Sequence, residues 1–157
     1  MNAITSLYGR IVELLSGKFF ESIGLLGIRI ALAGVFWRSY KTKVVEGSWL
    51  QIDETQYLIF ENEFTGLPLS SSLAVPLTVY AEFLFPLLLF VGLFTRFSAA
   101  ALMVMALVIQ IFVFPTQVHF WGWAMGIIAM AAILVSRGGG MFSLDRLFDR
   151  AFGAKAA

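Results

Sequence analysis

The sequence predicts an all-α polytopic membrane protein: an antiparallel bundle of four transmembrane helices, preceded by an N-terminal amphipathic helix. Two observations predict this class. Of the 157 residues, 59% are hydrophobic and 13% charged, and the mean hydropathy is +0.85, whereas soluble domains are about 45–50% apolar and about 25% charged. In addition, four apolar segments reach the length of about 20 residues that a helix needs to cross a bilayer.

The amphipathic helix is predicted just before the first span. The segment "ITSLYGRIVELLSGKFF" places its apolar residues at helical spacing, with charged residues elsewhere. This pattern is typical of a short helix on a membrane surface. The apolar residues are Leu7, Ile11, Leu14 and Leu15. The segment lacks the compact apolar core and the small-residue cleavage site of a signal peptide.

Four spans follow, in a single predicted domain that covers residues 1–157. We expect them at about 22–40, 73–94, 97–115 and 118–135. The links 95–96 and 115–119 are short, which forces the helices that they join to run antiparallel. The link 41–72 is long and polar. After the last span, a glycine-rich stop leads into a tail, 136–157, in which Ser143 is predicted to cap a second short amphipathic helix.

The distribution of Lys and Arg predicts the orientation. With both termini on one side of the membrane, that side collects most of the basic residues: Arg10, Lys18, Arg96, Arg137, Arg146, Arg150 and Lys155. The other side holds Arg38, Lys41 and Lys43, beside the acidic stretch 44–63. Because basic residues flank spans on the cytoplasmic side, we expect a plasma-membrane protein with cytoplasmic termini and an extracytoplasmic loop at 41–72.

Two ionisable side chains, Arg29 and Glu82, are predicted to lie deep inside the spans. A charge at the bilayer centre costs roughly 2.5–3.5 kcal/mol on insertion scales. At about 1.5 Å per residue, Arg29 lies about 10 Å and Glu82 about 16 Å from the same membrane edge. An arginine side chain bridges such a gap. We therefore expect an Arg29–Glu82 pair, either as a clamp that sets helix register or as part of a ligand or proton site.

Pro86 lies four residues after Glu82. Its ring removes the hydrogen bond that would reach the Glu82 carbonyl, which predicts a kink at this level. Membrane helices tolerate such a proline when a neighbour satisfies the freed carbonyl. The kink is compatible with a site-forming role and with a packing role.

A second polar group is predicted near the outer ends of the spans. His119 is followed at helical spacing by small residues, and the first span carries a similar stripe of Gly24, Gly27, Ala31 and Gly34. Such stripes mark close helix packing, within a bundle or in a homo-oligomer, so we expect His119 to face the bundle interior. Gln110 and Arg38 lie at a similar depth. These three residues are candidates for a small polar pocket, although interhelical hydrogen bonds and interface anchoring explain them equally well.

The residue content excludes several kinds of site. The chain has no cysteine and one histidine. This excludes disulfides, thiol catalysis, iron–sulfur clusters and a standard zinc, copper or bis-histidine haem site within one chain. We therefore predict no metal site and no cofactor resident in the chain. The net charge of +1 and the lack of a basic cluster indicate no nucleic-acid binding.

Three motifs carry a resemblance to a known family. They are "GIRIALAGVFW" in the first span, "AEFLFPLLLFVGLFTR" closing the second, and "SRGGGMFSLDRLF" after the fourth. With them the chain resembles the DoxX family of bacterial inner-membrane proteins over about 24–148. The resemblance implies a four-helix integral membrane protein of largely undefined biochemistry. It also matches Arg29, Lys43, Glu82 and Arg96 to the charged positions of the family.

The resemblance implies several biological settings. Some members of the family are the membrane subunit of a thiosulfate:quinone oxidoreductase, and others work beside superoxide-detoxifying or thiol-protective proteins. Another branch, which "VIQIFVFP" and the long acidic loop resemble, is encoded with metal-stress and peptide-modifying proteins.

Three alternative functions are compatible with these settings. The first is a non-enzymatic membrane subunit or accessory partner of another protein in a redox- or metal-stress system. The second is a quinone-interacting membrane subunit of an oxidoreductase, with Arg29, Glu82, Gln110 and His119 around the quinone headgroup. The third is a small transporter that acts as a homo-oligomer.

Overall fold

The computed structural model describes residues 3–153. Within them it contains helices and no strand, and the only β pairing is a bridge between Val44 and Ile52. Four helical segments are long and apolar enough to cross a membrane: α2 (Lys18–Lys41), α4 (Ser71–Val91), α5 (Thr95–Val108) with its π-helical continuation η1 (Ile109–Val113), and the segment Gln117–Arg137. The prediction of an all-α protein with four such helices is confirmed.

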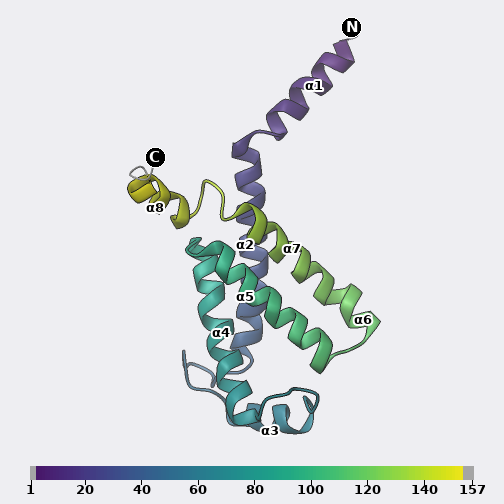
Figure 1. Cartoon of the computed structure of the whole chain (residues 1–157), viewed down its shortest axis with the longest axis vertical. Helices are drawn as coiled ribbons and strands as arrows, with labels where there is room; N and C mark the ends of the chain where they lie inside the picture. The colour runs from purple at the N-terminus through teal and green to yellow at the C-terminus, as the bar shows by residue number, and fades with distance from the viewer. Residues whose placement is uncertain (1–2, 154–157) are drawn as a thin grey trace.

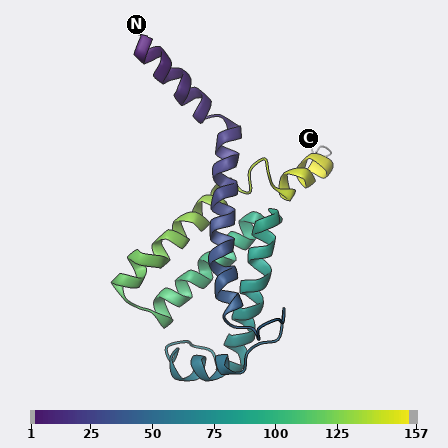
Figure 2. The same ribbon diagram turned by 180° about the vertical axis from the view of Figure 1, so that it is seen from behind.

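The long helices form two pairs (Figure 1). α2 packs mainly against α4, and α5 packs mainly against α7 (Met125–Arg137), while smaller α4–α5 and α2–α7 contacts join the pairs. Seen from either side, the α5–α7 pair slants away from α2 and α4 (Figure 1, Figure 2). We call the end where α4 turns into α5 and α7 leads to α8 (Leu144–Phe152) the α8 end, and the opposite end the α3 end, after α3 (Thr55–Asn62).

Buried apolar side chains form two core clusters. In the larger cluster, Leu32 and Phe36 of α2 meet Leu89 of α4, Leu102 of α5 and Leu134 of α7. The second cluster lies at the α3 end and contains Tyr40, Val44, Phe60, Ala74, Val75 and Val79. The loop after α2 therefore contributes to the core instead of lying free of the bundle.

The predicted N-terminal amphipathic helix is α1 (Ala3–Leu15), which projects away from the bundle (Figure 1). Its predicted apolar side chains are all exposed: Leu7, Ile11, Leu14 and Leu15. The helix therefore presents its apolar face to the surroundings and not to the bundle.

The loop 42–70 folds back onto the helices. The hydroxyl of Tyr40 donates a hydrogen bond to the Trp49 carbonyl, and α3 packs against α4. Farther along, Gly66 approaches the backbone of η1 so closely that an added Cβ would lie 2.3 Å from the Phe112 carbonyl oxygen. Only glycine permits this approach, so the loop is held against the tip of the α5–α7 hairpin.

Two π-helical turns flank that tip. They are η1 (Ile109–Val113) at the end of α5 and η2 (Phe120–Ala124), which follows the short α6 (Gln117–His119) and leads into α7. A π-bulge accommodates an extra residue in a helix, and such bulges occur frequently at functional sites. These turns bring Gln110 and His119 to the two sides of the tip.

The small-residue stripes do not pack inside the bundle, which corrects the sequence-based expectation. Gly24, Gly27, Ala31 and Gly34 of the first span are exposed. The small residues that follow His119 in the last span, Gly122, Gly126 and Ala129, are exposed as well. Added Cβ atoms at these glycines would meet no neighbour within 4 Å. His119 does not lie on the same helix face as the glycines that follow it. The π turn at Phe120–Ala124 changes the angular spacing between His119 and these glycines.

Candidate functional site

Arg29 is buried at the α8 end, where it binds backbone carbonyls. Its Nε donates to the Leu89 carbonyl at 2.8 Å and its Nη2 to the Phe90 carbonyl at 2.8 Å. Its Nη1 donates to the carbonyls of Gly139 at 3.1 Å and Phe142 at 2.8 Å. The last carbonyls of a helix have no intrahelical partner, so the guanidinium satisfies the end of α4 and ties the glycine-rich loop to it.

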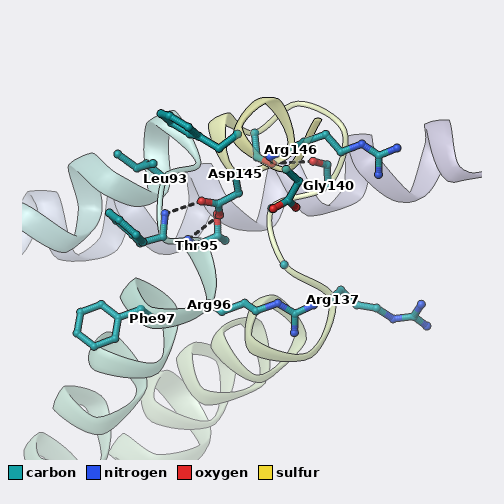
Figure 3. A pocket seen from close by; sticks show the side chains of 14 residues that line it. Leu93, Thr95, Arg96, Phe97, Arg137, Gly140, Asp145 and Arg146 are labelled. Atoms are coloured by element: carbon teal, nitrogen blue, oxygen red, sulfur yellow. Dashed lines mark hydrogen bonds between the residues drawn. The ribbon is translucent and has the colours of Figure 1, made fainter. Parts of the chain in front are cut away.

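Asp145 joins α8 to the start of α5 (Figure 3). Its two carboxylate oxygens accept hydrogen bonds from the backbone N–H groups of Phe94 and Thr95, at 2.7 and 2.8 Å. Ser143 caps α8, as predicted, by accepting a hydrogen bond from the Arg146 N–H at 3.3 Å. The "SLD" motif thus caps two helices.

Glycine is required where these segments cross. Gly92 has φ of 74°, and an added Cβ there would lie 2.6 Å from Nη2 of Arg29 and 2.7 Å from Cβ of Ser143. A Cβ at Gly139 would lie 2.6 Å from Cβ of Ser143. Arg96 donates to the Ser136 carbonyl at 2.8 Å and so ties α5 to the end of α7.

The α8 end therefore has a structural role. A pocket of about 800 Å³ opens there, lined by Arg96, Arg137, Asp145 and Arg146 among others. Figure 3 shows Asp145 directed at the backbone of Thr95, and Arg96 extending toward the end of α7. Because Arg96 binds carbonyls and Arg137 lies 3.1 Å from Glu21, much of the charge in this pocket is engaged in holding helix ends together.

The predicted Arg29–Glu82 pair is wrong. Glu82 is bonded instead to Ser39 on α2 and to Lys43 just beyond it. Arg29 precedes Ser39 by ten residues in the same helix, a distance of about 15 Å along the axis. The α4 helix extends beyond the level of α2 toward α3 (Figure 1), which places Glu82 opposite the last turns of α2 and not opposite its middle.

Glu82 belongs to a polar group at the α3 end. It is 1% exposed, and its Oε2 lies 2.9 Å from Nζ of Lys43, whose side chain is 13% exposed. Its Oε1 accepts a hydrogen bond from the Ser39 hydroxyl at 3.0 Å. Lys43 also donates to the Ser39 hydroxyl at 2.7 Å and to the Ser39 carbonyl at 3.2 Å. The buried carboxylate is thus paired and hydrogen-bonded, as a charge inside a membrane protein must be.

Pro86 lies inside α4 and is buried. The helix continues through it, although a proline nitrogen cannot donate to the carbonyl of Glu82 four residues earlier. The α4 backbone therefore lacks one intrahelical hydrogen bond in the turn between Glu82 and Pro86.

A cavity of about 940 Å³ opens beside this polar group. Its walls are largely apolar, drawn from the α3 segment, α4, α5 and the hairpin tip. Its polar lining includes Ser39, Lys43 and Glu82, which are bonded to one another, and His119 from the hairpin tip. The polar side chains Thr42, Gln56 and Thr78 also line it. A mostly apolar cavity with a few convergent polar groups is typical of a small-molecule site.

His119 enters the cavity within an aromatic stack. Its ring centroid lies 5.0 Å from that of Phe114 and 5.1 Å from that of Trp123. Its Nδ1 lies 2.6 Å from Oε1 of Gln110, and Nε2 of Gln110 donates to the Thr116 carbonyl at 3.1 Å. This arrangement holds the imidazole in a defined orientation.

The structure divides the predicted site residues among different places. It brings Glu82 and His119 to one cavity, with Gln110 supporting His119. Arg29 lies at the other end of the bundle, and Arg38 is exposed on α2. Sequence reasoning did not place Lys43 and Ser39 in the site. The resemblance to the family had matched Lys43 to a charged position of the family, and this was the available signal. The hydropathy pattern gave none, because Lys43 lies in a loop whose contact with α4 depends on tertiary structure.

The part of the chain that the structure describes holds no group of three or more His, Cys, Asp or Glu side chains able to bind a metal ion. The polar groups of the cavity offer hydrogen-bond donors, hydrogen-bond acceptors and charge. Such groups can orient a polar ring and can accept or donate protons.

This fold, with four spans and a polar-edged cavity between them, defines a multi-pass membrane protein that has a lipid environment around its apolar helices. The DoxX family model matches residues 24–115. The chain therefore belongs to the DoxX family. The matched region contains α4, most of α2, and both Lys43 and Glu82. No curated protein and no solved structure matches the chain.

Proposed function

We propose that this protein is a membrane subunit of a bacterial redox system, and that it binds a lipid-soluble ring ligand of the quinone class in the cavity at the α3 end. The observation that carries the proposal is the cavity itself. It combines apolar walls with a buried, paired carboxylate and an oriented histidine. A quinone headgroup has the matching chemistry, an apolar ring with polar oxygens at opposite edges.

The size and surroundings of the cavity support this ligand class. Ligand pockets commonly measure about 300–1,000 Å³, and this one, at about 940 Å³, lies at the upper end of that range. Aromatic rings of Phe114, Trp123 and Phe64 lie around it. Flat rings pack favourably against such side chains. The spanning helices α4 and α5 form part of the cavity lining, so the proposed ligand is one that dissolves in the membrane.

The subunit role follows from the residue content. A quinone exchanges electrons, and this chain has no cysteine for an iron–sulfur cluster and only one histidine, too few for a bis-histidine haem. We therefore propose that electrons pass to or from a partner protein and that this chain holds the quinone. The loop 42–70 contributes to the lining of the cavity and is the surface on which we propose that such a partner docks.

The proposed orientation follows the Lys and Arg distribution, with both termini in the cytoplasm and α3 outside. Single-cysteine labelling tests it, since the native chain has no cysteine to remove. A membrane-impermeant maleimide is expected to label Glu46→Cys in intact spheroplasts and Ala151→Cys after lysis alone. The opposite pattern would reverse the orientation.

Ligand binding is tested in nanodiscs. The purified protein is equilibrated with decylubiquinone, free quinone is removed on a spin column, and bound quinone is quantified against empty nanodiscs. We expect saturable binding. We expect Ala101→Phe to abolish it, because Ala101 lines the cavity and the larger side chain would occupy part of its volume. Ala132→Phe is the matched control because Ala132 is exposed on α7 and lies outside the cavity. Failure of both decylubiquinone and its reduced form, decylubiquinol, to bind above the level of empty nanodiscs would refute the proposal.

A further inference from the structure

The hydrogen bonds of Gln110 fix which way its side-chain amide points. The Thr116 carbonyl oxygen lies 3.1 Å from the amide nitrogen of Gln110. A carbonyl oxygen only accepts hydrogen bonds, so the NH₂ group must face it. With the amide reversed, two oxygens would face each other at this distance. The Oε1 atom of Gln110 therefore faces His119.

This orientation fixes the tautomer of His119. The Gln110 oxygen lies 2.6 Å from Nδ1 of the imidazole, and an amide oxygen is an acceptor. Nδ1 must therefore carry the proton. In a neutral imidazole the other nitrogen, Nε2, then has a free lone pair and acts as an acceptor.

Nε2 is the ring nitrogen of His119 that remains available to a ligand. No hydrogen bond reaches it from the residues that the structure describes. The ring lies between Phe114 and Trp123 and lines the cavity. This side of the cavity therefore presents a hydrogen-bond acceptor among apolar rings.

The polar group formed by Ser39, Lys43 and Glu82 also presents an acceptor to the cavity. An ammonium group has three protons, and those of Lys43 are directed at three oxygens, one on the Glu82 carboxylate and two on Ser39. The Ser39 hydroxyl gives its proton to Glu82. The carboxylate, by contrast, has more lone pairs than these two donors occupy. Thr42, Gln56 and Thr78 carry groups that donate or accept, so they do not discriminate between ligands.

From this distribution we infer that the cavity takes the reduced, dihydroxy form of its ring ligand, a quinol, in preference to the quinone. The hydroxyl groups of a quinol donate to His119 Nε2 and to the Glu82 carboxylate. The carbonyl oxygens of a quinone meet acceptors at both places, and a buried acceptor without a donor is unfavourable. The inference rests on the proposed function, because it concerns the same cavity. His119 is the specificity-determining residue, and Gln110 is its positioning residue.

The affinities of the two redox forms test the inference. Wild-type protein in nanodiscs is titrated with decylubiquinone, and with decylubiquinol under argon. We expect decylubiquinol to bind at least about tenfold more tightly, the factor that corresponds to one net hydrogen bond to a buried acceptor. Equal affinities, or tighter binding of decylubiquinone, would overturn the inference and leave the proposed function standing. Failure of both forms to bind would overturn both.

Variants of His119 and of a nearby aromatic residue test whether His119 causes the preference for decylubiquinol. His119→Phe keeps an aromatic ring between Phe114 and Trp123 but has no acceptor. We therefore expect decylubiquinol affinity to fall about tenfold, and decylubiquinone affinity to stay the same or to rise. Trp121→Phe is the control for a nearby aromatic change outside the cavity, and it should keep the preference. A preference for decylubiquinol that is undiminished in His119→Phe would overturn the role of His119.

The tautomer is tested without any ligand. Because the chain contains a single histidine, ¹⁵N-histidine labelling produces one pair of ring signals. We expect Nδ1 protonated and Nε2 unprotonated in wild type, and a mixture of tautomers in Gln110→Leu together with a reduced preference for decylubiquinol. A protonated Nε2 in the wild-type protein would overturn the inference.

Discussion

Nζ of Lys43 lies 2.9 Å from Oε2 of Glu82, and this contact ties the loop after α2 to the interior of α4. The lysine reaches in from beyond the end of its helix, while the carboxylate is 1% exposed. The pair borders the cavity that we propose as the ligand site. It thus holds the loop in place and shapes one polar wall of the cavity.

The Lys43–Glu82 pair is expected to show strong energetic coupling. Removing one partner leaves a buried charge without compensation, which costs about 3–5 kcal/mol. Removing both leaves no such charge. We therefore expect Lys43→Met and Glu82→Gln each to lower the free energy of unfolding by about 3 kcal/mol, and the double variant to lose clearly less than the sum. An SDS-unfolding titration in mixed micelles measures this.

The same cycle distinguishes the observed partner of Glu82 from the one predicted from depth alone. Arg29→Ala combined with Glu82→Gln should lose the sum of the single effects, since the two residues bind different groups at separate levels. A coupling energy between Arg29 and Glu82 larger than that between Lys43 and Glu82 would contradict the structure.

Replacing Arg29 even with lysine is expected to destabilise the protein. Its guanidinium makes four hydrogen bonds to carbonyls on two separate segments, and an ammonium group cannot reproduce this planar fork. Arg29→Lys should therefore lower the free energy of unfolding by about 2–3 kcal/mol. Arg38→Lys is the matched control, because Arg38 is exposed on the same helix. Equal stabilities of the two variants would show that the carbonyl contacts contribute nothing.

Gly92 is expected to be essential to the α4–α5 turn. Alanine there would strain a backbone with φ of 74° and would collide with Arg29 and Ser143. We expect Gly92→Ala to destabilise by about 2 kcal/mol or more, of which the backbone conformation alone accounts for about 1–2 kcal/mol. Gly126→Ala, at an exposed helical glycine with open space around it, should leave the melting temperature unchanged or slightly higher. Thermal unfolding followed by fluorescence-detected size exclusion compares the two.

Gly66 is expected to hold the loop against the hairpin tip. A Cβ at this position would lie 2.3 Å from the Phe112 carbonyl oxygen, so alanine must push the loop away from η1. Gly66→Ala should increase hydrogen exchange and protease cleavage across residues 43–69, and should weaken ligand binding in the adjacent cavity. Thr65→Ala, at an exposed neighbour, should change neither. Unaltered exchange in Gly66→Ala would show that the loop does not depend on this approach.

Asp145 is expected to stabilise the start of α5. Its carboxylate accepts hydrogen bonds from two backbone N–H groups at the start of α5, where N–H groups have no partner within the helix. Asp145→Ala should cost about 1 kcal/mol, the usual cost of losing a helix cap. Asp149→Ala removes an exposed carboxylate from the same short helix and should cost nothing measurable. The SDS-unfolding titration separates the two variants.

Much of the fold was predictable because it depends on local properties. Length and hydropathy identify helices such as α2 and α4, since a bilayer admits few other structures. Helical spacing identifies α1, and a serine before an apolar repeat identifies the cap of α8 by Ser143. The proximity of Gln110 to His119 was also expected from depth, because the short link between their helices leaves little freedom.

The remaining features depend on contacts between segments distant in the sequence. Depth along two separate helices did not identify the partner of Glu82, since α4 extends beyond α2 and the intervening loop returns Lys43 to it. The glycine stripes faced outward because packing decided which face of each helix is buried. The π turns beside Gln110 and His119 left no recognisable mark in the hydropathy pattern.

The sequence by itself determined that this chain crosses the membrane as four helices and that its few buried charges need partners, because both follow from the cost of polar groups in hydrocarbon. Only the tertiary structure decided which partners they have. Arg29 binds helix-end carbonyls at the α8 end, and Glu82 binds Lys43 beside the cavity. That choice depends on helix register, loop folding and π turns, each of which is set by packing across the bundle and not by any local run of residues.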